Sequence, residues 1–211
     1  LVSNRTPYPA KWLDFHGHYQ YGDKTILSYS IVGREILEMP SAELLDNSPV
    51  IQHTFTIAPG DSWRKIVLGS LGDRRSRNLK EGVFSLNNVT APRGLPEEEW
   101  ANPENSLIVT ATGDEDIKQF FAAGVHGDTE GMHWVVDPGH QMALFIPPSN
   151  KKQLIRVHRF SGKSIQELES FAKFLSKTKT QSITDPTDFT KGGDRLWKET
   201  LTLKGQLDVG V

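Results

Sequence analysis

The chain has 211 residues, with 24 basic and 26 acidic side chains, a net charge of −2 and 36% hydrophobic residues. This balance supports a hydrophobic core and disfavours a nucleic-acid binder that works by bulk charge or a polybasic membrane-surface protein. The absence of cysteine excludes disulfides, zinc–thiolate sites, iron–sulfur clusters and cysteine nucleophiles. No apolar run reaches the roughly 20 residues of a membrane-spanning helix. We therefore expect no nucleic-acid partner and no membrane span.

The N-terminal part of the chain predicts an antiparallel meander. Residues 16–21 and 25–32 form a hairpin pattern around a glycine-containing turn, because apolar and polar residues alternate on both sides of it. A second tight turn leads into a strand at 35–39. Pro40 is expected to end that strand, since proline cannot donate to a strand ladder. Residues 41–49 are then predicted to form a polar loop.

The next part of the chain carries further short strands. Residues 51–57 alternate most clearly between apolar and polar side chains, which is typical of a strand with one buried face. Residues 117–122 fit a strand or a short helix equally well. The other strands are expected at 64–69, 107–111, 134–136, 142–146 and 154–160. Residues 137–140 are expected to form the turn of a hairpin between the strands at 134–136 and 142–146.

One helix is predicted after the strands. Ser164 is a candidate N-cap, and Glu167 three residues later completes a capping box. Its apolar residues recur at helical spacing, so one face is expected to pack on the strands. These residues are Ile165, Leu168, Phe171, Ala172 and Leu175.

The pattern as a whole predicts a mainly β fold, an antiparallel β-sandwich with one C-terminal amphipathic helix. We expect residues 1–162 to form the sandwich, 163–180 the helix packed on it, and 181–211 an extended tail or linker toward a following domain. The first residue is not methionine, and the last residues are neither a helix end nor a charged tail. We therefore expect the chain to be a segment of a longer polypeptide.

The first hairpin carries histidines and aromatic rings that could bind a ligand. His16 and His18 are two residues apart in a strand, so both imidazoles are expected on one face. A metal site needs three or four ligands, and no third is suitably spaced, so we predict no metal site and favour two solvent-facing histidines. Tyr19, Tyr21 and Trp134 are candidate rings for stacking on a sugar, although most aromatic rings of a domain belong to its core.

Two further groups are candidates for chemistry. His126 lies in a glycine-rich stretch with carboxylates close by, a pattern that suits acid–base work in a cleft, although an exposed polar loop is the favoured interpretation. Arg74, Arg75 and Arg77 lie in a glycine-flanked loop. Their guanidinium groups suit a phosphate, a sulfate or an acidic sugar, although a solvated loop is the favoured interpretation there too.

Three stretches of the chain resemble a known group of proteins. They are YPAKW at 8–12 with HGHYQYGDKTILSY at 16–29 and EILEMP at 35–40, then ALFIPPS at 143–149, then FTKGGDRLW at 189–197 with TLTLKG at 200–205. They resemble the β-rich segment of large secreted proteins of planctomycetes and their relatives. In those proteins this segment precedes a β-propeller similar to sorbosone or glucose dehydrogenases, and a c-type haem domain often follows.

The resemblance implies a periplasmic or secreted module whose partners are neighbouring domains, a propeller and a c-type haem domain among them. The Cys-x-x-Cys-His haem motif is absent, so the resemblance implies no cofactor in this chain. We predict a non-catalytic β-sandwich module of a larger redox or carbohydrate-active protein, which docks neighbouring domains or binds saccharide. One alternative is a carbohydrate-active hydrolase or lyase with a His/Arg cleft, and another is a structural subunit of an assembly.

Overall fold

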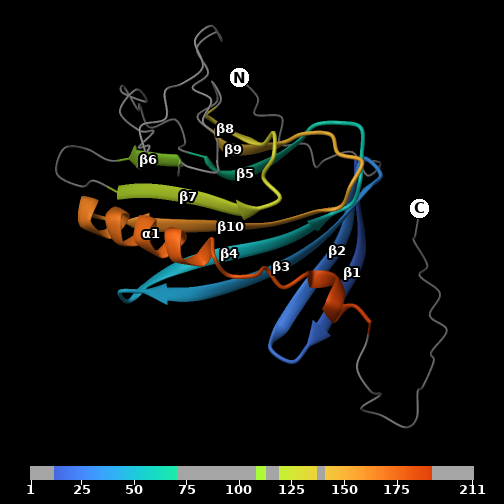
Figure 1. Ribbon diagram of the computed structural model, residues 1–211, viewed down its shortest axis with the longest axis horizontal. Coiled ribbons are helices and arrows are strands. Elements are labelled where there is room, and N and C mark those ends of the chain that lie inside the picture. The colour runs from blue at the N-terminus through green and yellow to red at the C-terminus, as the bar shows by residue number, and fades with distance from the viewer. Residues whose placement is uncertain (1–11, 71–107, 113–118, 137–140, 192–211) are drawn as a thin grey trace, which may run out of the picture.

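The computed structural model describes residues 12–70, 108–112, 119–136 and 141–191, and these form two antiparallel sheets (Figure 1). The seven-stranded sheet has, in spatial order, β1 (Leu13–Tyr21), β2 (Lys24–Ile31), β3 (Arg34–Leu45), β4 (Ser48–Ile57), β10 (Gln153–Gly162), β7 (Gln119–Gly127) and β6 (Ile108–Thr112). The three-stranded sheet has β5 (Arg64–Ser70), β9 (Gln141–Ile146) and β8 (His133–Val136). The predicted class, mainly β with antiparallel sheets and one late helix, is confirmed.

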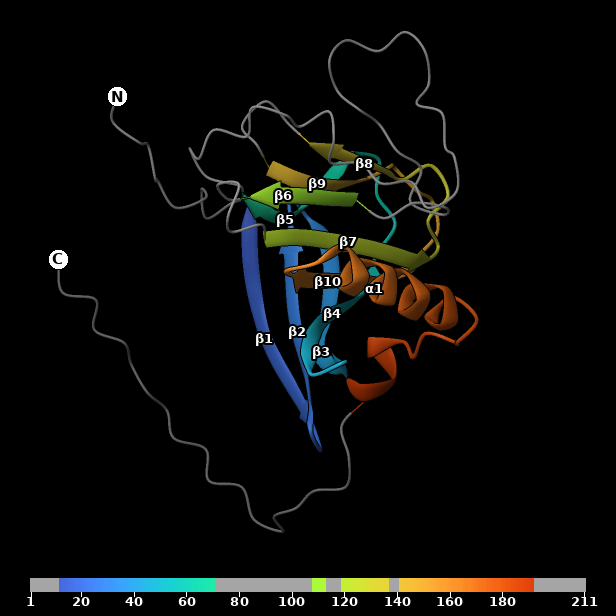
Figure 2. The same cartoon turned by 90° about the vertical axis from the view of Figure 1, so that its left-hand side faces the viewer.

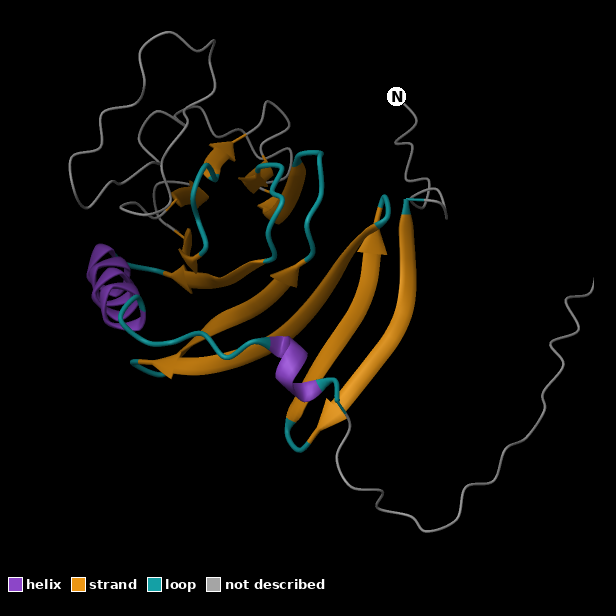
Figure 3. Cartoon of the chain, turned by 45° about the vertical axis from the view of Figure 1, so that its right-hand side comes forward, coloured by secondary structure: helices purple, strands orange, loops and turns teal. Residues whose placement is uncertain are grey.

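The main hydrophobic core lies between the two sheets. Trp134 and Leu144 enter it from the small sheet, and Ile57 and Ile155 enter it from the large one; none of the four is more than 1% exposed. Full burial of such an aliphatic side chain stabilises the fold by about 1.5–3 kcal/mol. In Figure 3 the small sheet covers one end of the large sheet, and the β1–β2 hairpin reaches beyond it.

The opposite face of the large sheet is covered by the helix α1 (Ile165–Thr178). Leu168, Phe171 and Leu175 form a second apolar cluster with Val50 and Phe160 of the sheet. Figure 2 shows α1 and the short 3-10 helix η2 (Pro186–Phe189) on this same side. Within the described residues, no helix is both long and apolar enough to cross a membrane.

The predicted N-cap of α1 is confirmed. Ser164 Oγ accepts a hydrogen bond from the backbone N–H of Glu167 at 3.2 Å. The carboxylate of Glu167 accepts a hydrogen bond from the backbone N–H of Lys163 at 2.5 Å. A capping box would use the N–H of Ser164, one residue later. Two N–H groups at the start of the helix, which have no partner within the helix, are thus satisfied.

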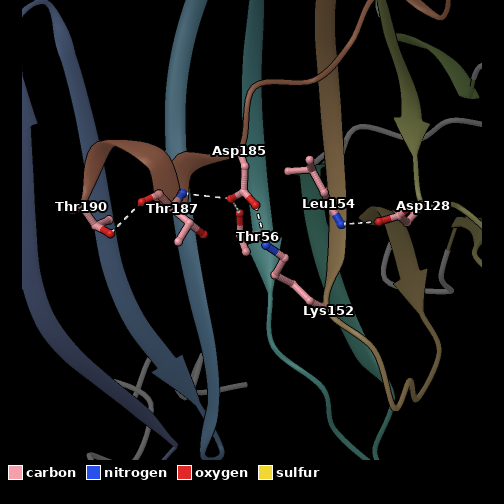
Figure 4. Close-up of polar contacts among 7 residues, drawn as sticks. All are labelled: Thr56, Asp128, Lys152, Leu154, Asp185, Thr187 and Thr190. Atoms are coloured by element: carbon pink, nitrogen blue, oxygen red, sulfur yellow. Dashed lines mark hydrogen bonds and ion pairs between the residues drawn. The ribbon is translucent and has the colours of Figure 1, made fainter.

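Residues 181–191 lie against the large sheet rather than leaving it, and Asp185 fastens them (Figure 4). Asp185 Oδ1 accepts from Thr56 Oγ1 at 2.6 Å and from the Thr187 N–H at 2.9 Å, and Lys152 Nζ donates to Oδ2 at 2.6 Å. Burial alone would raise the pKa of Asp185, but these hydrogen bonds outweigh it and hold the pKa well below its usual value. Residues 192–211 lie outside the described part of the chain.

The prediction that Pro40 ends a strand and that 41–49 form a loop is wrong. β3 continues through Pro40 and pairs with β4 as far as Leu45. β2 pairs with residues 34–38 of β3. From Pro40 onward no described strand pairs with this side of β3, so a residue without an N–H is tolerated there. The turn to β4 is made by Asp46 and Asn47, whose φ values of 47° and 66° suit a two-residue hairpin.

Candidate functional site

Four polar side chains form a row across adjacent strands of the large sheet. They are Tyr29 on β2, Glu38 on β3, His53 on β4 and Arg159 on β10, and we call them the polar row. Each member lies diagonal to the next, two residues from the directly opposed position in the strand register. Because side chains alternate between the faces of a strand, this offset puts all four on one face. That face is the one turned toward the small sheet.

Hydrogen bonds join the polar row from end to end. Tyr29 Oη donates to Glu38 Oε2 at 2.8 Å, Glu38 Oε1 lies 2.5 Å from His53 Nδ1, and Arg159 Nη2 lies 2.7 Å from His53 Nε2. Arginine can only donate, so His53 Nε2 accepts, and the ring proton sits on Nδ1 and is donated to Glu38. Both ring nitrogens of His53 and both carboxylate oxygens of Glu38 are therefore engaged.

The protonation states of the polar row follow from burial and from these contacts. Burial, and then the charge of Glu38, raises the pKa of Tyr29 far above its ordinary value. Burial alone would raise the pKa of Glu38, but hydrogen bonds from His53 and Tyr29 and the positive charge of Arg159 outweigh it and lower that pKa. At neutral pH the row therefore holds a phenol, a carboxylate and a guanidinium ion.

The polar row forms part of the wall of a cavity of about 480 Å³ between the two sheets. This volume lies within the range typical of small-molecule sites, about 300–1,000 Å³. The cavity lies where β5, the edge strand of the small sheet, passes over β2, β3 and β4. Its lining residues are Tyr29, Ile31, Val32, Ile36, Glu38, His53, Phe55, Ile57, Trp63, Arg64, Lys65, Ile66, Val67, Leu68, Ile146, Val157 and Arg159.

A second guanidinium group reaches the cavity from β5. Arg64 donates to Ser62 Oγ at 2.7 Å, to the carbonyl of Trp63 at 2.9 Å and to the carbonyl of Ile31 at 3.2 Å. Its Nε is buried and has no hydrogen-bond partner among the described residues. Because Arg64 lines the cavity, its guanidinium group places a positive charge on this side of it.

The expectation that His16 and His18 share a face is wrong. The register of β1 shifts between Phe15 and Gly17, which marks a β-bulge. His16 contacts Glu35 at 3.2 Å on the face that carries α1 and η2, whereas His18 pairs with Leu27 on the cavity side of the sheet. The extra residue in the bulge reverses the alternation, so the two imidazoles cannot reach one ligand.

The candidate aromatic rings are dispersed. The Tyr21 ring lies 5.3 Å from the ring of Phe189 in η2, and Tyr19 is on the same face of β1. Trp134 is 0% exposed in the core between the sheets, so its ring offers no surface to a ligand. The candidate arginines Arg74, Arg75 and Arg77 lie outside the described residues.

His126 lies in β7, not in an exposed loop as the sequence favoured, and it is buried beside His158 of β10. The two rings stack with centroids 5.0 Å apart, and His158 Nε2 lies 3.1 Å from His126 Nδ1. Burial is the main cause that lowers the pKa of His126 to about 4 and that of His158 to about 3. The described part of the chain holds no group of three or more His, Asp or Glu side chains that could bind a metal ion.

One signal for the polar row lies in the strand pattern of the sequence and not in any short motif. His53 lies in the same alternation phase as Ile51, Phe55 and Ile57, the apolar face of the most clearly alternating strand. A polar side chain in the buried phase of a strand needs a partner inside the fold. The partner, Arg159, could not be identified without the strand order, because it is more than 100 residues away.

Comparisons with known proteins identify one family model. Residues 2–38 match a family described as a domain of unknown function (DUF6797). Within the described residues this match includes β1, β2 and the first residues of β3, and with them Tyr29 and Glu38 of the polar row. No curated protein and no solved structure matches the chain. The match ends at Glu38, so the other two members of the polar row lie beyond it.

Proposed function

We propose that this chain is a non-catalytic β-sandwich module that binds a small molecule in the cavity between its sheets. The observation that carries the proposal is the cavity itself, whose walls are mostly apolar apart from the polar row and Arg64 of β5. Concave, mostly apolar sites with a few fixed polar groups are typical of small-molecule binding. The hydrogen-bonded polar row supplies groups that can orient a ligand.

The geometry of His53 argues against catalysis in this cavity. A general base needs a free lone pair within reach of the proton that it removes. The lone pair of His53 Nε2 accepts a hydrogen bond from Arg159, and Nδ1 donates to Glu38. We therefore assign His53 a positioning role, and a hydrolase or lyase is the less favoured function.

The proposal is tested with a neutral fluorescent probe, N-phenyl-1-naphthylamine, which brightens when it enters an apolar site. We expect saturable binding at one site per chain. Ile66 lines the cavity and is only partly buried, so Ile66→Trp fills the space without disturbing the closest-packed core. Leu44, which is 72% exposed and does not line the cavity, supplies the matched control Leu44→Trp.

We expect Ile66→Trp to abolish probe binding and Leu44→Trp to leave it unchanged. Circular dichroism and thermal melting establish that both variants are folded. Absence of probe binding to the unaltered chain, or equal binding to both variants, would contradict the proposal.

The larger context of the module stays a prediction. The resemblance to secreted planctomycete proteins favours a periplasmic or secreted location and neighbouring propeller and haem domains. Saccharide, for which the aromatic rings of the sandwich are the candidates, stays another predicted ligand. The intact mass and the visible absorption spectrum of the protein from its native source test this context. A polypeptide much larger than 23.6 kDa with a haem Soret band supports it, and a colourless 23.6 kDa species contradicts it.

A further inference from the structure

We propose that the cavity selects apolar molecules that carry one carboxylate, and that Arg159 receives the carboxylate. The inference rests on the proposed function, because it names the ligand class of the same cavity. It is supported by the hydrogen bonds that Arg159 makes to neutral acceptors and by the lack of an ion pair between Arg159 and any described carboxylate.

Within the described part of the chain, no carboxylate contacts the positive charge of Arg159 directly. The hydrogen bonds that it makes there go to neutral acceptors, His53 Nε2 at 2.7 Å and the carbonyl of Leu68 at 3.4 Å. Among the described residues no Asp or Glu oxygen lies within ion-pair distance of this guanidinium group. A guanidinium group has five N–H donors, so donors remain for a ligand.

Glu38, the acidic residue among the described residues that line the cavity, is already committed. One of its oxygens accepts from Tyr29 and the other contacts His53. Glu38 therefore fixes the ring of His53, and that ring in turn fixes one arm of Arg159. A guanidinium group that is held in place before binding loses less side-chain entropy when a ligand arrives.

The rest of the cavity adds positive charge. Among the described residues that line it, the guanidinium groups of Arg64 and Arg159 oppose the single carboxylate of Glu38. The hydrogen bonds of Arg64 also go to neutral oxygens. In a poorly solvated site, charge-assisted hydrogen bonds between guanidinium and carboxylate are strong and directional.

The apolar walls define the body of the ligand. Ile36, Phe55, Ile57 and Leu68 are buried beside the cavity. A sugar placed against them would leave hydroxyl groups without hydrogen-bond partners, which is costly in an apolar site. A hydrocarbon chain or an aromatic ring buries its surface there favourably. The combination points to an aliphatic or aromatic monocarboxylate.

The test compares two molecules of equal length, octanoate and octan-1-ol, as competitors that displace N-phenyl-1-naphthylamine at pH 7.5. Octanoate carries the charge and octan-1-ol carries only a hydroxyl group. We expect octanoate to displace the probe at a concentration about tenfold lower than octan-1-ol does, because hydrogen bonds to charged groups are stronger than those between neutral groups. In Arg159→Gln we expect the two concentrations to become equal, with octan-1-ol unaffected.

Two further variants separate charge recognition from structural damage. Arg159→Lys keeps the charge and is expected to retain part of the preference. Arg156, on the other face of the same strand, donates to Thr54 Oγ1 at 2.9 Å, so Arg156→Gln is the matched control and is expected to keep the full preference. Unchanged binding of the probe and octan-1-ol shows that the cavity is intact in each variant.

The outcomes distinguish the two proposals. If the probe does not bind to the unaltered chain, the proposed function fails. If the probe binds but octanoate and octan-1-ol displace it equally, or if Arg159→Gln keeps the preference for octanoate, the cavity remains a binding site and the inference about the carboxylate is overturned.

Discussion

Gly124 on β7 lies directly beneath Leu175 of α1. A Cβ atom added at Gly124 would overlap Leu175 Cδ1 and lie 3.2 Å from Leu175 Cγ. Leu175 is buried, so Gly124→Ala is expected to lower the free energy of unfolding by about 1–3 kcal/mol, the usual cost of overpacking. At Gly69 on β5, no atom of the other described residues, its two chain neighbours aside, lies within 4 Å of an added Cβ, so Gly69→Ala is the control. Equal losses in urea unfolding would contradict the packing argument.

Single residues also mark the limit of what the sequence predicts. The N-cap Ser164 was predictable, because its partner Glu167 is three residues away and the contact is local. The bulge between Phe15 and Gly17 was not, because strand alternation assumes an uninterrupted register. For the site residues His53 and Arg159, the sequence shows only that polar side chains occupy strand positions on an otherwise apolar face.

At the scale of elements, α1 covers the buried pair His126 and His158, and this arrangement predicts acid sensitivity. The charged groups that act on the pair are Arg156 on β10 and Lys179 at the end of α1, and both disfavour protonation. The folded pKa values of about 4 and about 3 lie below the unfolded value of 6.5. At pH values between the folded and the unfolded pKa, the unfolded state binds more protons than the folded state. The contribution of the pair to the free energy of unfolding is therefore complete above pH 6.5 and is lost as the pH drops toward 4.

We expect the free energy of unfolding to fall by an amount on the order of 3 kcal/mol between pH 6.5 and pH 4, since one pKa unit corresponds to about 1.4 kcal/mol. Urea unfolding across this range measures it. His158→Gln should flatten the dependence, and His18→Gln, at an exposed position on the other face, should not. A pH dependence that survives in the double variant of His126 and His158 would refute this assignment.

Elements were predicted well where one strand or helix contains its own signal. The period-2 pattern of residues 51–57 and the apolar spacing of α1 both agree with the structure. The prediction at Pro40 is wrong because a strand accepts proline where no neighbouring strand needs its N–H. Which strands flank β3 at Pro40 depends on the order of strands in the sheet, which the sequence of β3 alone does not contain.

At the scale of the whole molecule, the sequence predicted two antiparallel sheets but not their unequal widths. A seven-stranded sheet opposes a three-stranded one, and the cavity lies under the edge strand of the smaller sheet. Strand order brings β10 beside β4, and thereby Arg159 beside His53, from distant parts of the chain. The binding site is therefore a product of topology, and no short motif announces it.

The central claim is that the cavity between the sheets holds a carboxylate-bearing ligand through Arg159. A crystal structure of the chain grown with octanoate tests it most directly. We expect the hydrocarbon chain to lie between the sheets and the carboxylate to lie within about 3.2 Å of the Arg159 guanidinium group, the usual limit for such a hydrogen bond. An empty cavity, or octanoate in the cavity with its carboxylate turned away from Arg159, would contradict the claim.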